Sequence, residues 1–193
     1  MAQHHPLDPY VEWGGRRWRD ELERGLDWLG DLAGLRLLDV GTRNGRMATW
    51  FARAGATVVA VDIADQAMTE ASAFAQAHGV ADRIDLQRYS GDPADLPTGF
   101  DVIFAKSVVV LMQIDAAVEG FAAALNDGGR ILLIENARGP WPLHAARVLR
   151  RRSLRPHGAM YFTNQTVTAI RARFRVDLEH WAPPAVVIGA TKR

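Results

Sequence analysis

The stretch LRLLDVGTRNG, residues 35–45, decides the fold. A short apolar run leads directly into a loop with glycine at positions 41 and 45, and apolar residues at helical spacing follow it. An apolar run that ends in a glycine loop before a helix is typical of a buried strand in a sheet covered on both faces. We therefore predict a strand over residues 35–40 and a helix over residues 44–54.

The same alternation of apolar runs and helical spacing extends along the chain. Further strands are predicted over residues 57–61, 83–89, 100–105 and 130–135, and further helices over residues 16–30, 65–78, 115–125 and 163–174. Asp65 and Thr163 have the residue types of N-caps at the start of two of these helices. Regular alternation of strands and helices indicates a parallel sheet with helices on both faces.

Two strand-like runs, residues 175–181 and 185–191, close the chain around the dipeptide Pro183-Pro184. They are close enough to form a hairpin, and a hairpin cannot be parallel, so we expect it to add an antiparallel edge to the sheet. The predicted fold class is α/β, a doubly wound, mostly parallel seven-stranded sheet with an antiparallel C-terminal strand.

Length and composition favour a single domain over residues 1–193. The chain has 193 residues, of which 48% are apolar and 23% charged, and this balance excludes a disordered or low-complexity protein. No apolar stretch approaches the length of a membrane span, and the N-terminus lacks the apolar core of a secretory signal, so we expect a cytoplasmic protein without membrane association. Because cysteine is absent, disulfides and thiolate metal sites are excluded, and no metal site is expected.

The formal net charge of +1 hides an uneven distribution. Residues 136–175 contain nine arginines and no acidic residue, so the rest of the chain is net acidic. The run RVLRRRSLR, residues 147–155, suits either a phosphate, carboxylate or RNA partner or the solvated face of an amphipathic helix. We favour the solvated helix, and the acidic remainder of the chain argues against a nucleic-acid partner.

Carboxylates follow three of the predicted strands. Ligands of an open α/β sheet bind at the carboxyl ends of its strands, so Asp39, Asp62 and Asp92 converge on one rim. Gly41 and Gly45 allow the backbone to approach a ligand closely there. A carboxylate at Asp62 suits the hydroxyls of a ribose, and one at Asp92 suits an adenine amino group. Each aspartate alone is explained more simply as a turn or helix cap, but the three together indicate a nucleoside site.

Five segments in order also match one known family. LLDVGTRNGR resembles the first motif of the class I S-adenosylmethionine-dependent methyltransferases, VVAVDIADQAM the second, SGDPADLP the adenine-side loop, FDVIFAKSVVVLM the fourth-strand motif and LNDGGRILLIE the fifth. The resemblance spans about residues 35–193 and implies the Rossmann-like methyltransferase fold, S-adenosylmethionine as cofactor and methyl transfer as activity. One departure is Arg43, which stands where the family loop usually has a third glycine.

The resemblance also implies how the cofactor is held. The methionine moiety would lie at the loop near Asp39, the ribose hydroxyls at Asp62, and the adenine amino group at Asp92. The full implied set of cofactor-binding residues is Asp39, Gly41, Thr42, Arg43, Gly45, Asp62, Ile63, Met68, Asp92, Pro93 and Ala105. In this set Ile63, Met68 and Pro93 would lie beside the adenine and Ala105 near the methionine end.

The acceptor is expected between two variable segments, an N-terminal arm (residues 1–20) and a basic insert (residues 136–162). The candidate substrate-binding residues there are the aromatic side chains Tyr10, Trp13, Trp141 and Tyr161. His144 and His157 are the candidate catalytic bases because histidine titrates near neutrality, although each alone is explained more simply as a surface residue. We expect a small organic acceptor, anionic if the arginines face it, from specialised metabolism for example. Oxygen is the default nucleophile, with nitrogen and carbon open.

Three alternatives stay open beside this interpretation. A methyltransferase-like protein that no longer methylates, acting as an accessory subunit or a cofactor-binding scaffold, would explain Arg43. An RNA methyltransferase would use the arginine run. A nicotinamide-dependent dehydrogenase is disfavoured because the loop lacks G-x-G-x-x-G. The residues after the fourth strand, Ala105-Lys106-Ser107-Val108, also lack the N/D-P-P-Y/F motif, which disfavours DNA bases and protein glutamine as acceptors.

Overall fold

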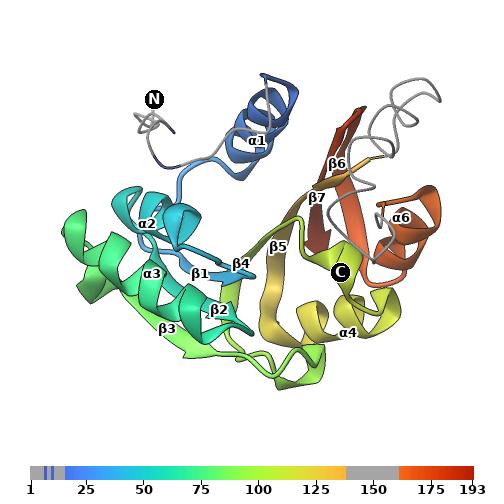
Figure 1. Ribbon diagram of the computed structural model, residues 1–193. Coiled ribbons are helices and arrows are strands. Elements are labelled where there is room, and N and C mark those ends of the chain that lie inside the picture. Colours follow the sequence, from blue (N-terminus) through green and yellow to red (C-terminus); the bar gives the residue numbers. More distant parts are fainter. Residues whose placement is uncertain (1–6, 8–9, 11–15, 138–160) are drawn as a thin grey trace, which may run out of the picture.

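A seven-stranded sheet forms the centre of the molecule (Figure 1). The structure, a computed structural model, describes residues 7, 10, 16–137 and 161–193. The strands are β1 (Arg36–Val40), β2 (Thr57–Asp62), β3 (Ile84–Arg88), β4 (Phe100–Lys106), β5 (Leu125–Asn136), β6 (Phe174–Ala182) and β7 (Ala185–Lys192). The helices are α1 (Arg16–Leu29), α2 (Arg46–Arg53), α3 (Asp65–Ala77), α4 (Ile114–Ala124) and α6 (Asn164–Arg171), and the 3₁₀ turns are η1 (Ala81–Arg83), η2 (Pro93–Asp95) and η3 (Val109–Leu111).

The strand order is β3-β2-β1-β4-β5-β7-β6, with β1 to β5 parallel. The chain moves outward from β1 to β3 and then returns to the other side of β1 with β4, so the order reverses between β1 and β4. Open α/β sheets bind ligands at such a switch point, outside the carboxyl ends of the strands. Strand β1 is buried apart from its first residue, and β2 is buried apart from its first and last residues. The predicted doubly wound, mostly parallel sheet is confirmed.

The C-terminal hairpin forms one edge of the sheet through antiparallel pairing, as predicted. Strand β7 is antiparallel to both neighbours, and it lies between β5 and β6, so β6 is the outermost strand. Residues 185–190 of β7 are all buried, whereas β6 alternates between half-buried and exposed positions over most of its length. The strand that is apolar on both faces is therefore inserted into the sheet, and the more polar strand forms the edge.

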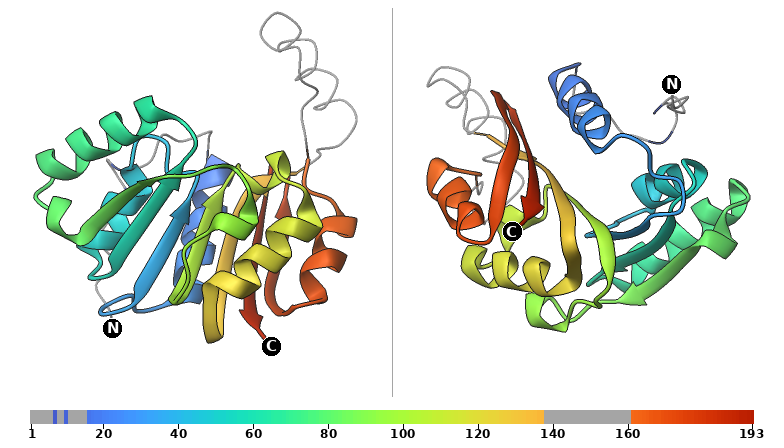
Figure 2. Two further views of the ribbon diagram at one scale, coloured as in Figure 1. Left: turned by 90° about the horizontal axis from the view of Figure 1, so that it is seen from below. Right: turned by 180° about the vertical axis from the view of Figure 1, so that it is seen from behind.

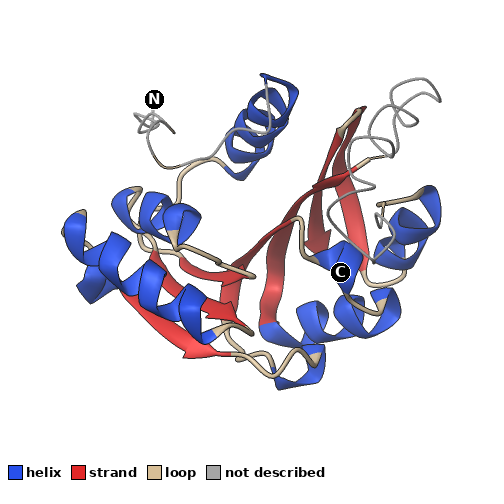
Figure 3. Ribbon diagram, in the orientation of Figure 1, coloured by secondary structure: helices blue, strands red, loops and turns tan. Residues whose placement is uncertain are grey.

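Helices cover both faces of the sheet, as two further views show (Figure 2). Helices α1, α2 and α3 pack on one face, and α4 and α6 pack on the other, each against its own apolar core (Figure 3). The largest buried side chains of the first core include Trp50, Phe51 and Phe104, and those of the second include Phe100, Phe121 and Phe162. Within the described ranges, no helix combines the length and the hydropathy that a membrane span requires.

The two predicted helix caps have different outcomes. Thr163 is the N-cap of α6, and its side chain forms a capping box with Thr166, as the residue type predicted. Asp65 is instead the first residue of α3, and the N-cap is Ala64, which provides no side-chain hydrogen bond. The Asp65 carboxylate pairs with Arg88 at the end of β3, so a contact between two elements takes the place of the local cap.

Strand β5 begins earlier than predicted. Leu125 already pairs with Phe100 of β4, and the register then shifts so that Arg130 pairs with Val102. Residues 126–129, which lie between these two pairs, are therefore accommodated as an irregularity within the strand.

Helix α1 lies close against β5 and β7. Its apolar face is buried and consists of Trp18, Leu22, Leu26 and Leu29. The approach is close because Gly189 of β7 has no side chain, and an added Cβ there would lie 2.6 Å from the Trp28 ring. Helix α1 thus completes the core over the C-terminal half of the sheet.

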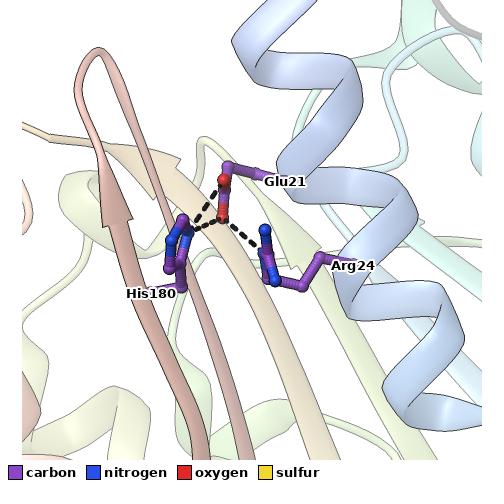
Figure 4. A network of polar contacts seen from close by, with 3 residues as sticks. All are labelled: Glu21, Arg24 and His180. Carbon is purple, nitrogen blue, oxygen red and sulfur yellow. Dashed lines mark hydrogen bonds and ion pairs between the residues drawn. The ribbon is translucent and has the colours of Figure 1, made fainter.

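A buried carboxylate ties α1 to the hairpin (Figure 4). Glu21 is 2% exposed, and both of its oxygens lie 2.9 Å from Nδ1 of His180 in β6. Arg24 Nε lies 3.7 Å from Glu21 Oε2, and Arg17 donates a hydrogen bond to the carbonyl of Pro183. These contacts hold the first turn of α1, and Trp18 with it, near the carboxyl ends of the strands.

Candidate functional site

A cavity of about 770 Å³ opens at the carboxyl ends of the strands, beside β1 and β4. Its volume lies in the range of small-molecule and cofactor sites. It has two walls, which are defined by their lining residues. The glycine-loop wall consists of Asp39, residues 41–44, Asp62, Ile63, Tyr89 and Gly91, and the β4 wall consists of Lys106, Ser107, Val108, Leu111 and Met112.

The loop after β1 has the backbone conformation that glycine favours. The φ angle is 76° at Gly41, 52° at Arg43 and 71° at Gly45. The N–H groups of Gly41 and Thr42 both donate to the carbonyl of Val61, at 2.9 and 3.0 Å. Arg43 therefore adopts the left-handed conformation that a glycine would take freely, and the loop keeps this path although the residue differs from the family pattern.

Close packing fixes the position of this loop. A Cβ added at Gly41 would lie 2.9 Å from Cγ2 of Val108, so the loop contacts the β4 wall directly. A Cβ at Gly45 would lie 2.6 Å from Cβ of Ala71 in α3. Gly45 is the N-cap residue of α2 and does not line the cavity, so the structure gives it a packing role between α2 and α3.

Asp39 is a buried carboxylate at the base of the glycine-loop wall. It is 2% exposed, and its Oδ2 has no hydrogen-bond partner in the described part of the chain. Burial, aided by the Asp62 carboxylate and opposed by the Lys106 ammonium, raises the pKa of Asp39 to about 7. A carboxylate oxygen with an open acceptor position at a cavity wall favours a ligand that brings a cation or an N–H group.

Asp62 ends β2 and organises the loop. Its Oδ2 accepts the N–H of Arg43 at 2.9 Å, and its Oδ1 accepts the N–H of Ala64 at 3.1 Å. Each carboxylate oxygen has further acceptor capacity, so the half-buried Asp62 can also accept ligand hydroxyls. Ile63 beside it is 59% exposed and offers an apolar surface to a flat ring.

Two residues of the glycine-loop wall, Tyr89 and Gly91, follow β3 closely in the sequence. Tyr89 is buried, and its hydroxyl has no partner among the described residues. Burial and the nearby carboxylates of Asp92 and Asp95 raise the pKa of Tyr89 to about 12, so the phenol is neutral at physiological pH. Asp92 itself caps η2, because its Oδ1 accepts the N–H of Ala94 at 3.0 Å.

Four more of the predicted cofactor residues lie outside the cavity lining. Met68 is half-buried on α3, Pro93 is buried in η2, and Asp92 is exposed at the start of η2. Ala105 is fully buried in the core under α4, because successive residues of β4 point to opposite faces of the sheet. The residue that reaches the cavity from the end of β4 is its neighbour Lys106.

None of the β4-wall residues is among the site residues predicted from the sequence. Ser107, directly after β4, has a φ of 58°. Arg43 and Ser107 are the two non-glycine residues with positive φ in the described ranges, and both line the cavity. Backbone strain of this kind is concentrated at functional sites. The sequence feature that marks Lys106 and Ser107 as candidate site residues is their position directly after a predicted strand.

Glu135 holds the β4 wall from the neighbouring strand β5. Its Oε1 accepts the N–H groups of Val108 at 3.1 Å and Val109 at 2.8 Å. The side chain is fully buried, and Oε2 has no partner within the described ranges. Burial, opposed by the surrounding backbone N–H groups, raises the pKa of Glu135 to about 8. Sequence reasoning missed this residue because nothing local marks a carboxylate that acts on a distant turn.

Most of the predicted acceptor residues fall in parts of the chain that the structure does not describe. These residues are Trp13, Trp141, His144 and His157. Tyr10 lines the cavity, although it is buried and its ring lies 5.4 Å from the ring of His78 in the loop after α3. Tyr161 is half-buried and lies outside the cavity lining.

The glycine-loop wall fits an adenosine that carries a cationic tail. Asp62 offers acceptors for ribose hydroxyls, Ile63 offers a surface for the base, and the open oxygen of Asp39 suits a positive charge. Gly41 allows the tail to approach the backbone. The described residues contain no group of three histidine or carboxylate side chains that could hold a metal ion.

Comparison with known proteins agrees with this geometry. Residues 38–131 match a family model described as a methyltransferase domain. The S-adenosyl-L-methionine-dependent Diels-Alderase iccD of Talaromyces variabilis is 30% identical over 124 residues, which are 61% of this chain and 42% of that protein. A ubiquinone biosynthesis O-methyltransferase of Bradyrhizobium sp. (strain ORS 278) is 28% identical over 153 residues, 77% of this chain and 58% of that protein. The chain thus spans about half the length of these relatives.

Solved structures share the fold. Magnesium protoporphyrin IX methyltransferase from Synechocystis PCC 6803, crystallised with bound SAH, superimposes with a TM-score of 0.72 at 18% identity. The match covers 95% of this chain and 91% of that chain. At this level of identity, the similarity shows that the two chains have the same architecture.

Proposed function

Because the chain belongs to the class I S-adenosylmethionine-dependent methyltransferases, with S-adenosylmethionine as its cofactor, we propose that it transfers the methyl group of that donor to a small-molecule acceptor. The observation that carries the proposal is the glycine-loop wall, where two carboxyl side chains line one cavity: Asp39, whose buried Oδ2 has no partner among the described residues, and Asp62, whose oxygens have further acceptor capacity. Oxygen is the proposed nucleophile, and the ubiquinone biosynthesis O-methyltransferase among the relatives supports it.

In this proposal the chain binds the donor through the residues that line the glycine-loop wall. Asp62 accepts the ribose hydroxyls, Ile63 covers the adenine, and Asp39 attracts the cationic tail. Asp92 uses Oδ1 for the N–H of Ala94, which leaves Oδ2 for the adenine amino group. Gly45, Met68, Pro93 and Ala105 act behind the wall by shaping it. When bound, the donor supplies an activated methyl group, and the chain has to orient the acceptor and exclude water.

The acceptor side of the proposal includes residues from both variable segments. Tyr10, Trp13, Trp141 and Tyr161 are the proposed aromatic contacts, and His144 or His157 would remove a proton if the acceptor needs it. A small acceptor is supported because the cavity volume of about 770 Å³ must hold the donor as well.

A direct test follows the methyl group. The protein would be incubated with methyl-labelled S-adenosylmethionine and a fractionated extract of small metabolites, and the fractions would be analysed for labelled product. We expect label in a small molecule and an equal amount of S-adenosylhomocysteine. The Asp62→Ala variant should lose most of this transfer, whereas Asp85→Ala, on the surface of β3, should retain it. Label that enters only RNA would support the RNA methyltransferase alternative instead.

A second candidate function is a reaction that uses the bound cofactor without consuming it. It is favoured by one relative, which is described as an S-adenosyl-L-methionine-dependent Diels-Alderase, and by Arg43 in place of the family glycine. The same incubation separates the two functions. Tight cofactor binding with no S-adenosylhomocysteine formed in the presence of the full extract would favour the non-methylating scaffold.

A further inference from the structure

We propose that Lys106 recognises an ionised oxygen on an apolar acceptor and thereby determines which class of molecule the enzyme methylates. This inference rests on the proposed function, because it assigns the β4 wall to the acceptor once the glycine-loop wall holds the donor. The acceptor class would be compounds with a phenolate or carboxylate oxygen attached to an apolar, preferably aromatic, body.

The position of Lys106 in the sheet supports this role. Lys106 is the last residue of β4, and β4 pairs with β1, where Ala105 lies opposite Val40. The next two residues complete the link to the loop, because Ser107 has a left-handed backbone and Val108 packs against Gly41. Lys106 at the end of β4 is therefore separated by strand β1 from Asp62 at the end of β2, where we propose that the donor's ribose is held.

The distribution of charged residues around the cavity also supports this role of Lys106. Two carboxylates, Asp39 and Asp62, belong to the glycine-loop wall, and Lys106 is the charged residue of the β4 wall. The Lys106 ammonium is close enough to Asp39 to lower that carboxyl's pKa. It also lies 6.0 Å from the ring of Trp18, which α1 holds in place. A cationic donor thus meets carboxylates, and an anionic acceptor meets an ammonium.

Arg43 and Arg46 also line the cavity, the first from the glycine loop and the second from the start of α2. Arg46 lies over the ring of Phe74 in α3, with its guanidinium carbon 4.9 Å from the ring centroid. Arg43 belongs to the glycine loop itself. Lys106 is therefore the cation that the β4 wall presents.

The rest of the β4 wall is apolar. Leu111 is 69% exposed, and Met112 and Val108 line the cavity beside it. Among the described residues, Ile63 and Leu111 are the two large apolar side chains that are strongly exposed, and they lie on opposite walls of this one cavity. If Ile63 covers the adenine, Leu111 is left to cover the body of the acceptor, which favours an apolar molecule.

An ionised acceptor also simplifies the chemistry. The acceptor oxygen forms a bond to the methyl carbon while the bond from that carbon to sulfur breaks, and the bonding pair remains on sulfur. An oxygen that has already lost its proton needs no base in this step, and the described cavity lining contains no histidine. The Lys106 ammonium would lower the pKa of a bound phenol and so supply the reactive form.

The test uses the full chain saturated with S-adenosylhomocysteine. Binding of 2-naphthoate and of its neutral counterpart 2-naphthamide would be measured by calorimetry for the wild type, Lys106→Met and Lys106→Arg. A second arm would record the phenolate absorption of bound 4-nitrophenol as a function of pH. We expect the wild type to prefer naphthoate, or to lower the pKa of 4-nitrophenol, or both, and the responding arm identifies a carboxylate or a phenol as the acceptor group.

Lys106→Met should weaken naphthoate binding roughly tenfold, as expected for one charge-assisted hydrogen bond, and should return the nitrophenol pKa to its value in solution. Naphthamide and S-adenosylhomocysteine should bind Lys106→Met within about twofold of the wild type, and Lys106→Arg should retain the preference for the anion. The proposal is overturned if the wild type neither prefers naphthoate nor lowers the pKa of 4-nitrophenol. It is equally overturned if Lys106→Met retains the response that the wild type shows. It is also overturned if Lys106→Met loses S-adenosylhomocysteine, since Lys106 would then hold the donor's own carboxylate. A wild type that binds no S-adenosylhomocysteine would instead remove the proposed function.

Discussion

The two walls of the cavity meet where Gly41 packs against Val108, but they are held in different ways. In the glycine-loop wall, main-chain N–H groups of Gly41 and Thr42 bond to the carbonyl of Val61, and Asp62 adds one side-chain acceptor. In the β4 wall, one buried side chain, Glu135, receives two main-chain N–H groups from the turn after β4. The first wall depends mainly on backbone conformation, and the second depends in addition on one buried side chain from a neighbouring strand.

This difference separates the tasks of the two walls. A donor that is the same throughout a family is served by a loop whose shape depends on glycines and aspartates. In the proposal, the acceptor meets a wall of ordinary residue types, Lys106, Leu111 and Met112, and Glu135 of another strand holds the turn of that wall. Substitutions in the two walls should therefore act through different interactions.

The largest effect is expected when the glycine loop is displaced. Gly45→Ala would place a Cβ 2.6 Å from Cβ of Ala71 and would also force alanine into a φ of 71°. We expect the free energy of unfolding to fall by about 2–5 kcal/mol, the sum of the left-handed backbone cost and overpacking. Binding of S-adenosylhomocysteine should weaken as well. Chemical denaturation and calorimetry would measure the two effects.

Gly79→Ala is the matched control for this change. Gly79 has a similar φ of 67°, but an added Cβ would meet nothing within 4 Å. It should cost only the backbone contribution, about 1–2 kcal/mol, and leave cofactor binding unchanged. Equal losses in the two variants would show that the contact with Ala71 does not fix the loop.

The next effect concerns pH, since each wall contains a buried carboxylate with a raised pKa. Folded Asp39 and Glu135 keep a proton up to about pH 7 and 8, whereas in the unfolded chain both lose it near pH 4. Stability present at low pH is therefore lost as the pH rises to these values, by up to about 1.4 kcal/mol per pH unit for each group. We expect the decline between pH 5 and 7 to be steeper than that between pH 7 and 8.

Two variants would show which of the two buried carboxyl groups causes the decline in the free energy of unfolding over each pH range. Glu135→Gln should make the free energy of unfolding nearly independent of pH between 7 and 8, whereas Asp39→Asn should reduce the slope only below pH 7. Urea denaturation from pH 5 to 9 would measure both slopes. If Asp39→Asn removed the decline above pH 7, the assignment of the two carboxylates would be reversed.

The smallest effect is expected at the two strained non-glycine residues, one in each wall. Arg43→Gly and Ser107→Gly remove a left-handed backbone cost of about 1–2 kcal/mol but add flexibility to the unfolded chain. Each should change the free energy of unfolding by less than about 1 kcal/mol, in the stabilising direction. Ala81→Gly in the 3₁₀ turn η1 should instead destabilise by about 0.5–1 kcal/mol. A loss of stability in Arg43→Gly like that of Ala81→Gly would mean that the arginine side chain, rather than the backbone, defines the loop.

Much of the fold followed from patterns that are local in the sequence. The order of apolar strands and amphipathic helices is set within each segment, and the doubly wound sheet follows from their alternation. The position of β7 could not be predicted in this way, because it depends on which of two adjacent strands gains more from burial on both sides. The pairing of Asp65 with Arg88, which leaves Ala64 as the N-cap, also depends on a residue in another element.

The residues of the candidate site also differ in whether a local sequence pattern marks them. Asp39, Gly41, Asp62 and Ile63 are marked by their position after a strand, and the structure brings all four to one cavity. Lys106 was visible only as a residue after a strand, and Glu135 acts on a turn 26 residues away in sequence. A contact between distant segments leaves no local sequence pattern, so the residues of the β4 wall could be identified only from the structure.

The most direct test of the account is a calorimetric titration of S-adenosylhomocysteine into the wild type, Asp62→Ala and Lys106→Met. We predict clear binding to the wild type, a loss of about 1–3 kcal/mol of binding free energy for Asp62→Ala, and affinity within about twofold of the wild type for Lys106→Met. A wild type that fails to bind at millimolar concentration, or an Asp62→Ala variant with unchanged affinity, would contradict the claim that the glycine-loop wall holds the donor.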